Sequence, residues 1–201
     1  VRLRFRNGGG PTGSREPRAL EAGKPVVTAN KELIAAQGSE LISAAERSGV
    51  ALLFEAAVGG GIPIIRPLSE TLAGERITRV MGIVNGTTNF ILTRMSEEGT
   101  AYVEALQQAQ ELGYAEPDPT ADVSGADAAA KAAILASLAF GTWVGLDHVP
   151  HTGITEITIY LKPALQKARV TVTVGGVTVR TWAAGVDGSF LVWPHDFEPV
   201  D

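Results

Sequence analysis

The stretch KPVVTANKELIAAQGSELISAAERSGVALLFEAAV, residues 24–58, decides the fold class. Its first part, KPVVTAN, predicts a strand that ends in a turn, and ALLFEAAV at the other end is typical of a buried strand. Between them, residues 31–49 have the pattern of a helix, which we expect to be interrupted at Gly38 and closed by Gly49. A strand, a helix and a second strand in succession predict an α/β or α+β fold.

The flanking sequence continues the alternation of strands and helices. Residues 77–84, ITRVMGIV, predict a further strand, and residues 170–182 alternate on both sides of a Gly-Gly pair, which is typical of a β-hairpin. Either Asn85 or Thr87 is positioned to cap a helix. Helical patterns recur in four segments, the last of which is apolar nearly all round and expected to be buried: residues 17–23, 85–99, 101–113 and 126–140.

Composition excludes several classes of protein. Of the 201 residues, 45% are hydrophobic, so a sizeable core can form. The net charge is −5, and no basic patch is rich enough to indicate a nucleic acid as partner. The absence of cysteine excludes disulfides, thiol catalysis and zinc–thiolate sites, and it fits a cytoplasmic protein. No apolar run approaches a membrane span and no signal peptide is visible, so we expect no membrane as partner.

The segment GYAEPDPTADVSGADAAAK, residues 113–131, is the richest in candidate chemistry. Asp127 and Lys131 are four residues apart and share a helix face. One interpretation is a surface salt bridge worth a few tenths of a kcal/mol. The other is that apolar surroundings tune Lys131 for proton transfer, with Asp127 as its partner. A substrate ammonium group would then be held by the carboxylates that precede the helix, namely Glu116, Asp118 and Asp122.

Two further stretches leave alternatives open. VTANK, residues 27–31, follows a strand, where ligands bind in α/β folds, but Asn30 as a helix cap and a solvated Lys31 explain it equally well. The glycines of residues 59–61 permit a phosphate cradle or a carbonyl-lined monovalent cation site. An ordinary tight turn, with Pro63 in the first turn of a helix, is the simpler interpretation.

The remaining motifs give little evidence for a functional site. NGGGPTG, residues 7–13, formally satisfies G-x-G-x-x-G, but it contains a proline and follows an arginine-rich stretch, residues 1–5, that predicts a short exposed strand. The histidines lie in loop-like sequence without the spacing of a helical metal pair or a Ser/His/Asp triad: His148, His151 and His195.

Four sequence segments, in order across residues 22–140, together resemble the sequences of a known family. They are AGKPVVTANKELIA, FEAAVGGGIPIIRPL, GIVNGTTNFILTRM and LGYAEPDPTADVSGADAAAKAAILA. Together they resemble homoserine dehydrogenase, the NAD(P)-dependent family that interconverts aspartate semialdehyde and homoserine. HTGITEIT, residues 151–158, resembles a further short segment of that family.

The resemblance implies roles for the polar residues. Lys131 would donate the proton when the aldehyde is reduced, and Lys31 would assist at the junction of cofactor and substrate. Glu116 and Asp127 would hold the substrate amino group. Residues along the nicotinamide cofactor, NADP or NAD, would be Thr28, Lys31 and Gly113.

The resemblance also implies a monovalent cation site of the sodium type, formed by Glu55 with the backbone carbonyls of Val58, Gly60 and Ile62. It implies a mixed sheet covered by helices in a homodimer. The expected domains are a remnant of a dinucleotide-binding Rossmann domain, a catalytic and dimerisation domain, and an atypical segment with a β-hairpin, over residues 1–30, 31–158 and 159–201.

The two ends of the chain depart from the family pattern. The chain begins with Val1, and residues 1–18 and those after about 158 do not resemble the family. We therefore expect a piece of a longer enzyme with little activity by itself. The alternative is a non-catalytic oligomerisation remnant in which Asp127 and Lys131 are only structural.

Overall fold

The computed structural model describes residues 15–155, 157–160, 169–174 and 177–182. Within these ranges the chain forms two compact units. One contains residues 15–84 and 128–150, and the other contains residues 85–127 and the described residues from 151 onward. Both units mix helices and strands, so the predicted α/β class is confirmed. Three predictions lie outside the described residues: the strand over 1–5, the glycine motif over 7–13 and the loop around His195.

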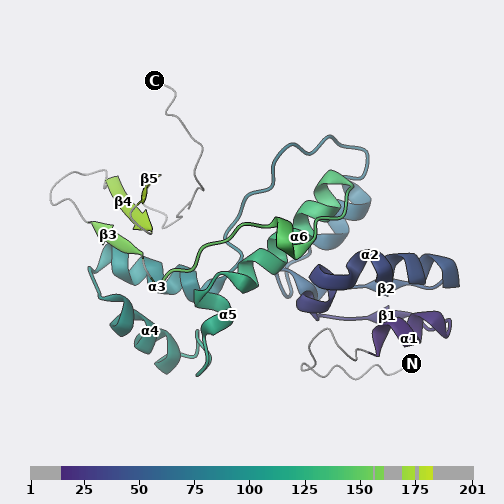
Figure 1. Cartoon of the computed structure of the whole chain (residues 1–201), viewed down its shortest axis with the longest axis horizontal. Coiled ribbons are helices and arrows are strands. Elements are labelled where there is room, and N and C mark those ends of the chain that lie inside the picture. Colours follow the sequence, from purple (N-terminus) through teal and green to yellow (C-terminus); the bar gives the residue numbers. More distant parts are fainter. Residues whose placement is uncertain (1–14, 156, 161–168, 175–176, 183–201) are drawn as a thin grey trace. The chain divides into compact units, whose positions relative to one another are not determined.

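The first unit is built around a strand–helix–strand unit. Strands β1 (Val26–Val27) and β2 (Leu52–Leu53) pair in parallel, with Val26 opposite Leu52, and α2 (Lys31–Ser48) connects them. Figure 1 shows α1 (Glu16–Glu21) and α2 beside this pair of strands. The side chain of Asn30 accepts a hydrogen bond from Leu33 N at 3.0 Å and starts α2. Gly49, at φ 64°, ends it in the left-handed conformation that favours glycine.

The predicted interruption of α2 at Gly38 is wrong. The helix runs unbroken from Lys31 to Ser48, and Gly38 is buried within it. A Cβ atom at this position would lie 2.0 Å from Cη2 of Trp143. Next to this tryptophan, the hydroxyl of Ser137 accepts a hydrogen bond from Val144 N at 2.9 Å and donates one to Ala133 O. Gly38 therefore provides space for a tryptophan instead of breaking the helix.

Two strand predictions in this unit need correction. ALLFEAAV pairs only at Leu52–Leu53, and the chain then turns into a 3₁₀ helix, η1 (Glu55–Ala57). Residues 77–84 form no strand. Among the described residues, β1 pairs with β2, β3 pairs with β4, and β4 pairs with β5. Val80, Met81 and Ile83 are 37%, 50% and 53% exposed. Strand-like composition forms a strand only where a neighbouring strand accepts its hydrogen bonds, and this segment has no such neighbour here.

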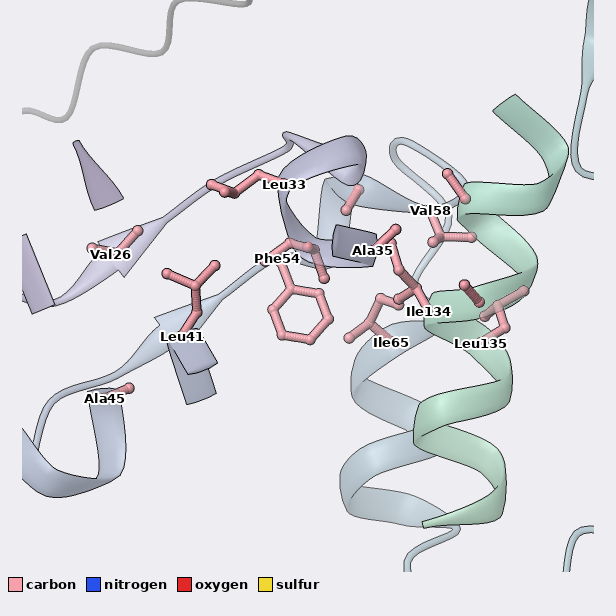
Figure 2. Close-up of a cluster of buried hydrophobic side chains, with 14 of the residues drawn as sticks. Val26, Leu33, Ala35, Leu41, Ala45, Phe54, Val58, Ile65, Ile134 and Leu135 are labelled. Atoms are coloured by element: carbon pink, nitrogen blue, oxygen red, sulfur yellow. The ribbon is translucent and has the colours of Figure 1, made fainter. Parts of the chain in front are cut away.

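The core of the first unit joins α2 to α6 (Ala126–Phe140). Figure 2 shows the Phe54 ring with Leu41 on one side and Ile65 on the other, and Ala35 close to Ile134. Ile65 precedes η2 (Pro67–Thr71), a single π-helical turn, and η3 (Leu146–His148) follows α6. The apolar face of α6 thus confirms the prediction that this helix is buried, since Ala133 and Ile134 are each 1% exposed.

The second unit contains three helices and a short antiparallel sheet. The helices are α3 (Gly86–Glu97), α4 (Tyr102–Glu111) and α5 (Thr120–Val123). The strands are β3 (Thr158–Tyr160), β4 (Arg169–Val174) and β5 (Val177–Trp182), in the order β3-β4-β5. The pairing of β4 with β5 confirms the predicted hairpin. Ile91, Ala105 and Ala109 are fully buried between α3 and α4.

Candidate active site

A buried asparagine of the second unit bonds to residues of α3, α5 and the first turn of α6. Asn85 caps α3, because its Oδ1 accepts a hydrogen bond from Thr88 N at 2.8 Å. Its Nδ2 donates to Asp122 Oδ1 at 2.6 Å and to Asp127 Oδ2 at 2.8 Å. Asp122 lies in α5 and Asp127 in the first turn of α6. Both Asn85 and Asp127 are buried, at 6% and 8% exposure, so this is an interior polar network and not a surface pair.

Glu116 differs from Asp127 in its surroundings. Its side chain is exposed, and its backbone carbonyl, like that of Pro117, accepts a bond from Gln110 Nε2 at 3.3 Å. Asp118 is exposed as well and starts α5, accepting from Thr120 Oγ1 at 2.6 Å and from Thr120 N at 3.1 Å. These two bonds lower the pKa of the Asp118 carboxyl below its ordinary value of 3.8. The predicted carboxylates therefore differ in burial: Asp127 is buried, Asp122 is half-buried, and Glu116 and Asp118 are exposed.

Gly113 closes α4 with φ 78°, a conformation that favours glycine, and no atom of the described residues lies within 4 Å of a Cβ placed there. Next to it, the carbonyl of Tyr114 accepts a bond from Thr87 Oγ1 at 2.6 Å, and the Tyr114 ring stacks on Phe90 with centroids 4.8 Å apart. The open space at Gly113 suits the close approach of a ligand.

Lys131 belongs to the first unit and lies within the buried part of α6. Its ammonium donates a hydrogen bond to the carbonyl of Val84 at 2.6 Å. The side chain is half-buried, and the nearby helix residues Ala130 and Ala133 contribute to the core. A fixed backbone acceptor orients the ammonium group, as a proton-transfer role requires.

Thr28 and Lys31 flank the start of α2 in the same unit. Thr28 is 6% exposed, its N donates to Leu53 O at 2.8 Å, and its Oγ1 accepts from Asn30 N at 3.1 Å. Lys31 is the first residue of α2, and its ammonium lies 3.1 Å from Glu32 Oε1. Both residues thus stand where β1 ends and α2 begins, at the carboxyl end of a parallel strand.

The glycine loop after β2 is fixed by one carboxylate. Glu55 Oε1 accepts bonds from Ile64 N at 2.7 Å and Ile65 N at 2.9 Å, and Oε2 accepts from Arg66 N at 2.9 Å. Gly59 and Gly60, with φ 76° and 58°, take the conformation that favours glycine. Glu55 therefore shapes the loop that contains Val58, Gly60 and Ile62.

The histidines and carboxylates of the described residues contain no group of three or more that could hold a metal ion. The cation site expected at Glu55 and the carbonyls of Val58, Gly60 and Ile62 stays a prediction, because most of its ligands are backbone oxygens. His148 lies beside Asp147, with Nδ1 3.1 Å from Oδ1 on the exposed surface. His151 lies against the glycine at 125, where a Cβ atom would be 3.5 Å from its ring.

Sequence reasoning identified Asp127 but missed the residue that holds it. Asn85 was expected at most as a helix cap, and Asp122 as one member of an acidic segment. The sequence signal that could have identified Asn85 is its position at the start of a helix whose first turn contains no acidic residue. An amide has both donors and acceptors, so a capping asparagine has two N–H groups left for other partners.

Comparison with known proteins assigns the chain to a family. A family profile for homoserine dehydrogenase matches residues 63–188, more than half of the chain. The chain belongs to the homoserine dehydrogenase family. A second profile, the NAD binding domain of homoserine dehydrogenase, matches residues 14–55.

Individual proteins similar to the chain support this family assignment. Over 140 residues the chain is 63% identical to homoserine dehydrogenase of Mycobacterium leprae, covering 70% of this chain and 32% of that protein. Over 154 residues it is 57% identical to the Corynebacterium glutamicum enzyme, covering 77% and 35%. The chain thus spans about a third of the length of the curated relatives that it matches.

Solved structures give the same result for the fold. A homoserine dehydrogenase from Thiobacillus denitrificans matches with a TM-score of 0.70 and 42% identity, over 82% of this chain and 43% of that one. A hyperthermophilic archaeal homoserine dehydrogenase in complex with NADPH matches with a TM-score of 0.63 and 36% identity, over 82% and 50%.

Proposed function

We propose that this chain provides the substrate-binding and proton-transfer part of a homoserine dehydrogenase. The reaction is the interconversion of L-aspartate 4-semialdehyde and L-homoserine, a step in the biosynthesis of threonine, methionine and isoleucine in the cytoplasm. One observation carries the proposal: Asp127 is a buried carboxylate fixed by an amide, one helical turn before Lys131. Buried ionisable groups that a fixed hydrogen bond orients are found preferentially at functional sites.

The chain's own residues supply the acid–base chemistry. The hydride would be supplied or accepted by a nicotinamide cofactor, NADP or NAD, when one is bound. Lys131, already oriented by the carbonyl of Val84, stabilises the alkoxide oxygen and gives it a proton. In the reverse direction Lys131 accepts the proton of the homoserine hydroxyl, with Lys31 assisting. Asp127 and Glu116 hold the substrate ammonium group.

Two further sites belong to this proposal. Thr28, Lys31 and Gly113 lie along the cofactor, supported by the strand-end position of the first two and the open space at Gly113. Glu55 and the backbone carbonyls of Val58, Gly60 and Ile62 hold a monovalent cation of the sodium type, in a loop that the Glu55 carboxylate also fixes. The chemistry of this donor set fits, because hard cations take backbone carbonyl oxygens as ligands.

We propose that the 201-residue chain alone binds NADPH weakly and turns over slowly. Among the described residues, parallel pairing is limited to β1 and β2, whereas a dinucleotide site of the Rossmann type is built on several parallel strands. The proposed domains remain a Rossmann remnant over 1–30, a catalytic and dimerisation domain over 31–158 and a separate segment over 159–201. Within the described ranges, no helix is long and apolar enough to cross a membrane.

Calorimetric titration of the chain with L-homoserine tests the site. Asp127→Asn should weaken binding at least tenfold, since a hydrogen bond to a charged group contributes about 1.5–3 kcal/mol. Lys131→Met should leave binding within a few-fold of the wild type and remove the residual oxidation of NADPH with aspartate semialdehyde. Asp147→Asn, at an exposed carboxylate, is the matched control and should change neither.

Two results separate the proposal from its rival. Equal binding by the wild type and the Asp127→Asn variant would mean that Asp127 and Lys131 are only structural, as in a non-catalytic oligomerisation remnant. Turnover of aspartate semialdehyde at ordinary enzyme rates would show that the 201-residue chain is sufficient for activity and would contradict the expected weak cofactor binding.

A further inference from the structure

We infer that Gln110 is a positioning residue of the substrate site, whose side-chain amide fixes the backbone that carries Glu116. The inference rests on the proposed function, in which Glu116 helps to hold the substrate ammonium group, and it adds one residue to that function. The observation behind it is that Nε2 of Gln110 donates to two successive backbone carbonyls, those of Glu116 and Pro117, each at 3.3 Å.

The segment between α4 and α5 is hydrogen-bonded to α4 at two places. At the first, Tyr114 N donates to Ala109 O at 2.8 Å. At the second, Gln110 reaches Glu116 and Pro117. Proline has no N–H group of its own, and within the described residues the hydrogen bonds of this residue pair are the two from Gln110. The backbone on both sides of the Glu116 carbonyl therefore depends on one side chain for its polar contact to the helix.

The carboxylate of Glu116 is placed by its backbone. The side chain is exposed, and among the hydrogen bonds and ion pairs of the described residues none involves its carboxylate oxygens. Ordering a side chain and its loop when a ligand binds costs free energy, and a backbone that is already held in place lowers this cost. Gln110 thus acts on the ligand through Glu116 and needs no contact with the ligand itself.

The geometry of Gln110 fits this role. Both of its partners are carbonyls, which only accept hydrogen bonds, so the nitrogen of the amide must face them and the oxygen must point away. The assignment therefore does not depend on the usual ambiguity between the two ends of an amide. The backbone of the same residue also closes α4, because Gly113 N donates to Gln110 O at 3.1 Å. One residue thus ends the helix and holds the segment that follows it.

The test compares Gln110→Met with Gln107→Met in the full chain. Methionine has nearly the length of glutamine but no N–H group, so it removes the two bonds to the segment. Gln107 is the matched control, an exposed residue of α4 whose Nε2 bonds to Glu111 Oε1 at 2.9 Å. In an NMR titration with L-homoserine, we expect Gln110→Met to raise the Kd about threefold or more and Gln107→Met to leave it unchanged. A smaller rise, or an equal rise in both variants, would overturn the inference.

A double-mutant cycle with Glu116→Gln separates positioning from a general structural role. If Gln110 acts through Glu116, then Gln110→Met has no further effect on the Kd once Glu116 has lost its charge, whereas independent effects would add. Additive effects of the two substitutions would overturn the inference.

A further readout needs no substrate. The carbonyl carbons of Glu116 and Pro117 should change chemical shift in Gln110→Met and stay unchanged in Gln107→Met. If the wild type does not bind L-homoserine, the proposed function fails for this chain, but these shifts still decide whether Gln110 holds the segment, and unchanged shifts would overturn the inference. If Gln110→Met does not fold, the wild type decides it. Side-chain amide protons of Gln110 without nuclear Overhauser contacts to residues 116 and 117 would then overturn the inference.

Discussion

The polar residues of this chain act through a few buried or backbone-directed contacts. Lys131 donates to the backbone carbonyl of Val84, Glu55 accepts from three backbone amides, and Asn85 donates to two aspartates. Each of these contacts fixes a side chain that would otherwise have several rotamers. Orientation is what proton transfer and ammonium binding need, because a misplaced group of the right kind contributes little. The same contacts stabilise the fold, so their removal has a measurable cost.

Replacing Glu55 by alanine should destabilise the first unit. The change leaves the amides of Ile64, Ile65 and Arg66 without their acceptor, and unsatisfied polar groups cost about 1–3 kcal/mol. We expect a loss of that order in the free energy of unfolding, measured by urea denaturation. Glu70→Ala is the control: it removes only the exposed ion pair with Arg66 and should cost less than about 0.5 kcal/mol. Equal losses in both variants would show that Glu55 does not anchor the loop.

The pKa of Asp118 predicts a local response to acid at the start of α5. Hydrogen bonds from the side chain and backbone of Thr120 lower this pKa below 3.8 in the folded state. A lowered pKa means that the stabilisation is present above the unfolded pKa and is lost as the pH falls through the folded one. The amide signal of Thr120 should therefore titrate below about pH 3.8 in NMR spectra. Asp118→Asn should abolish this titration, and a midpoint above the ordinary value would contradict the assignment.

At the scale of elements, most helices and the β4–β5 hairpin could be predicted from the sequence, whereas the strand expected over residues 77–84 did not form. Helix α6 was predicted from Ala126 to Phe140 because an apolar period and glycines at both ends are local signals. Residues 77–84 have the composition of a strand, but whether it forms depends on a partner segment that composition does not name. The role of Asn85 depends on residues 37 and 42 positions away, so no local pattern contained it.

Gly38 gives a test of element packing. Alanine is the better helix former by about 1 kcal/mol, so Gly38→Ala would stabilise an exposed helix. Here the added Cβ would collide with Trp143, and overpacking costs about 1–3 kcal/mol. We expect a net loss of stability on thermal denaturation, with rescue in the double variant Gly38→Ala/Trp143→Leu. Ser39→Ala, at the exposed next position, should not destabilise. A stabilised Gly38→Ala would mean that the indole moves away freely.

At the scale of the whole molecule, the exposed apolar segment 77–84 bears on assembly. We propose that it pairs with a second copy of the chain in a homodimer, because it combines strand-forming composition with exposed Val80, Met81 and Ile83. Sedimentation velocity should show a dimer for the wild type. The double variant Met81→Glu/Ile83→Glu should be monomeric with an unchanged circular dichroism spectrum, since buried like charges oppose association. Val103→Glu, at another exposed apolar residue, in α4, should remain dimeric. A monomeric wild type, or dissociation by Val103→Glu alone, would contradict the assignment of this segment to the dimer interface.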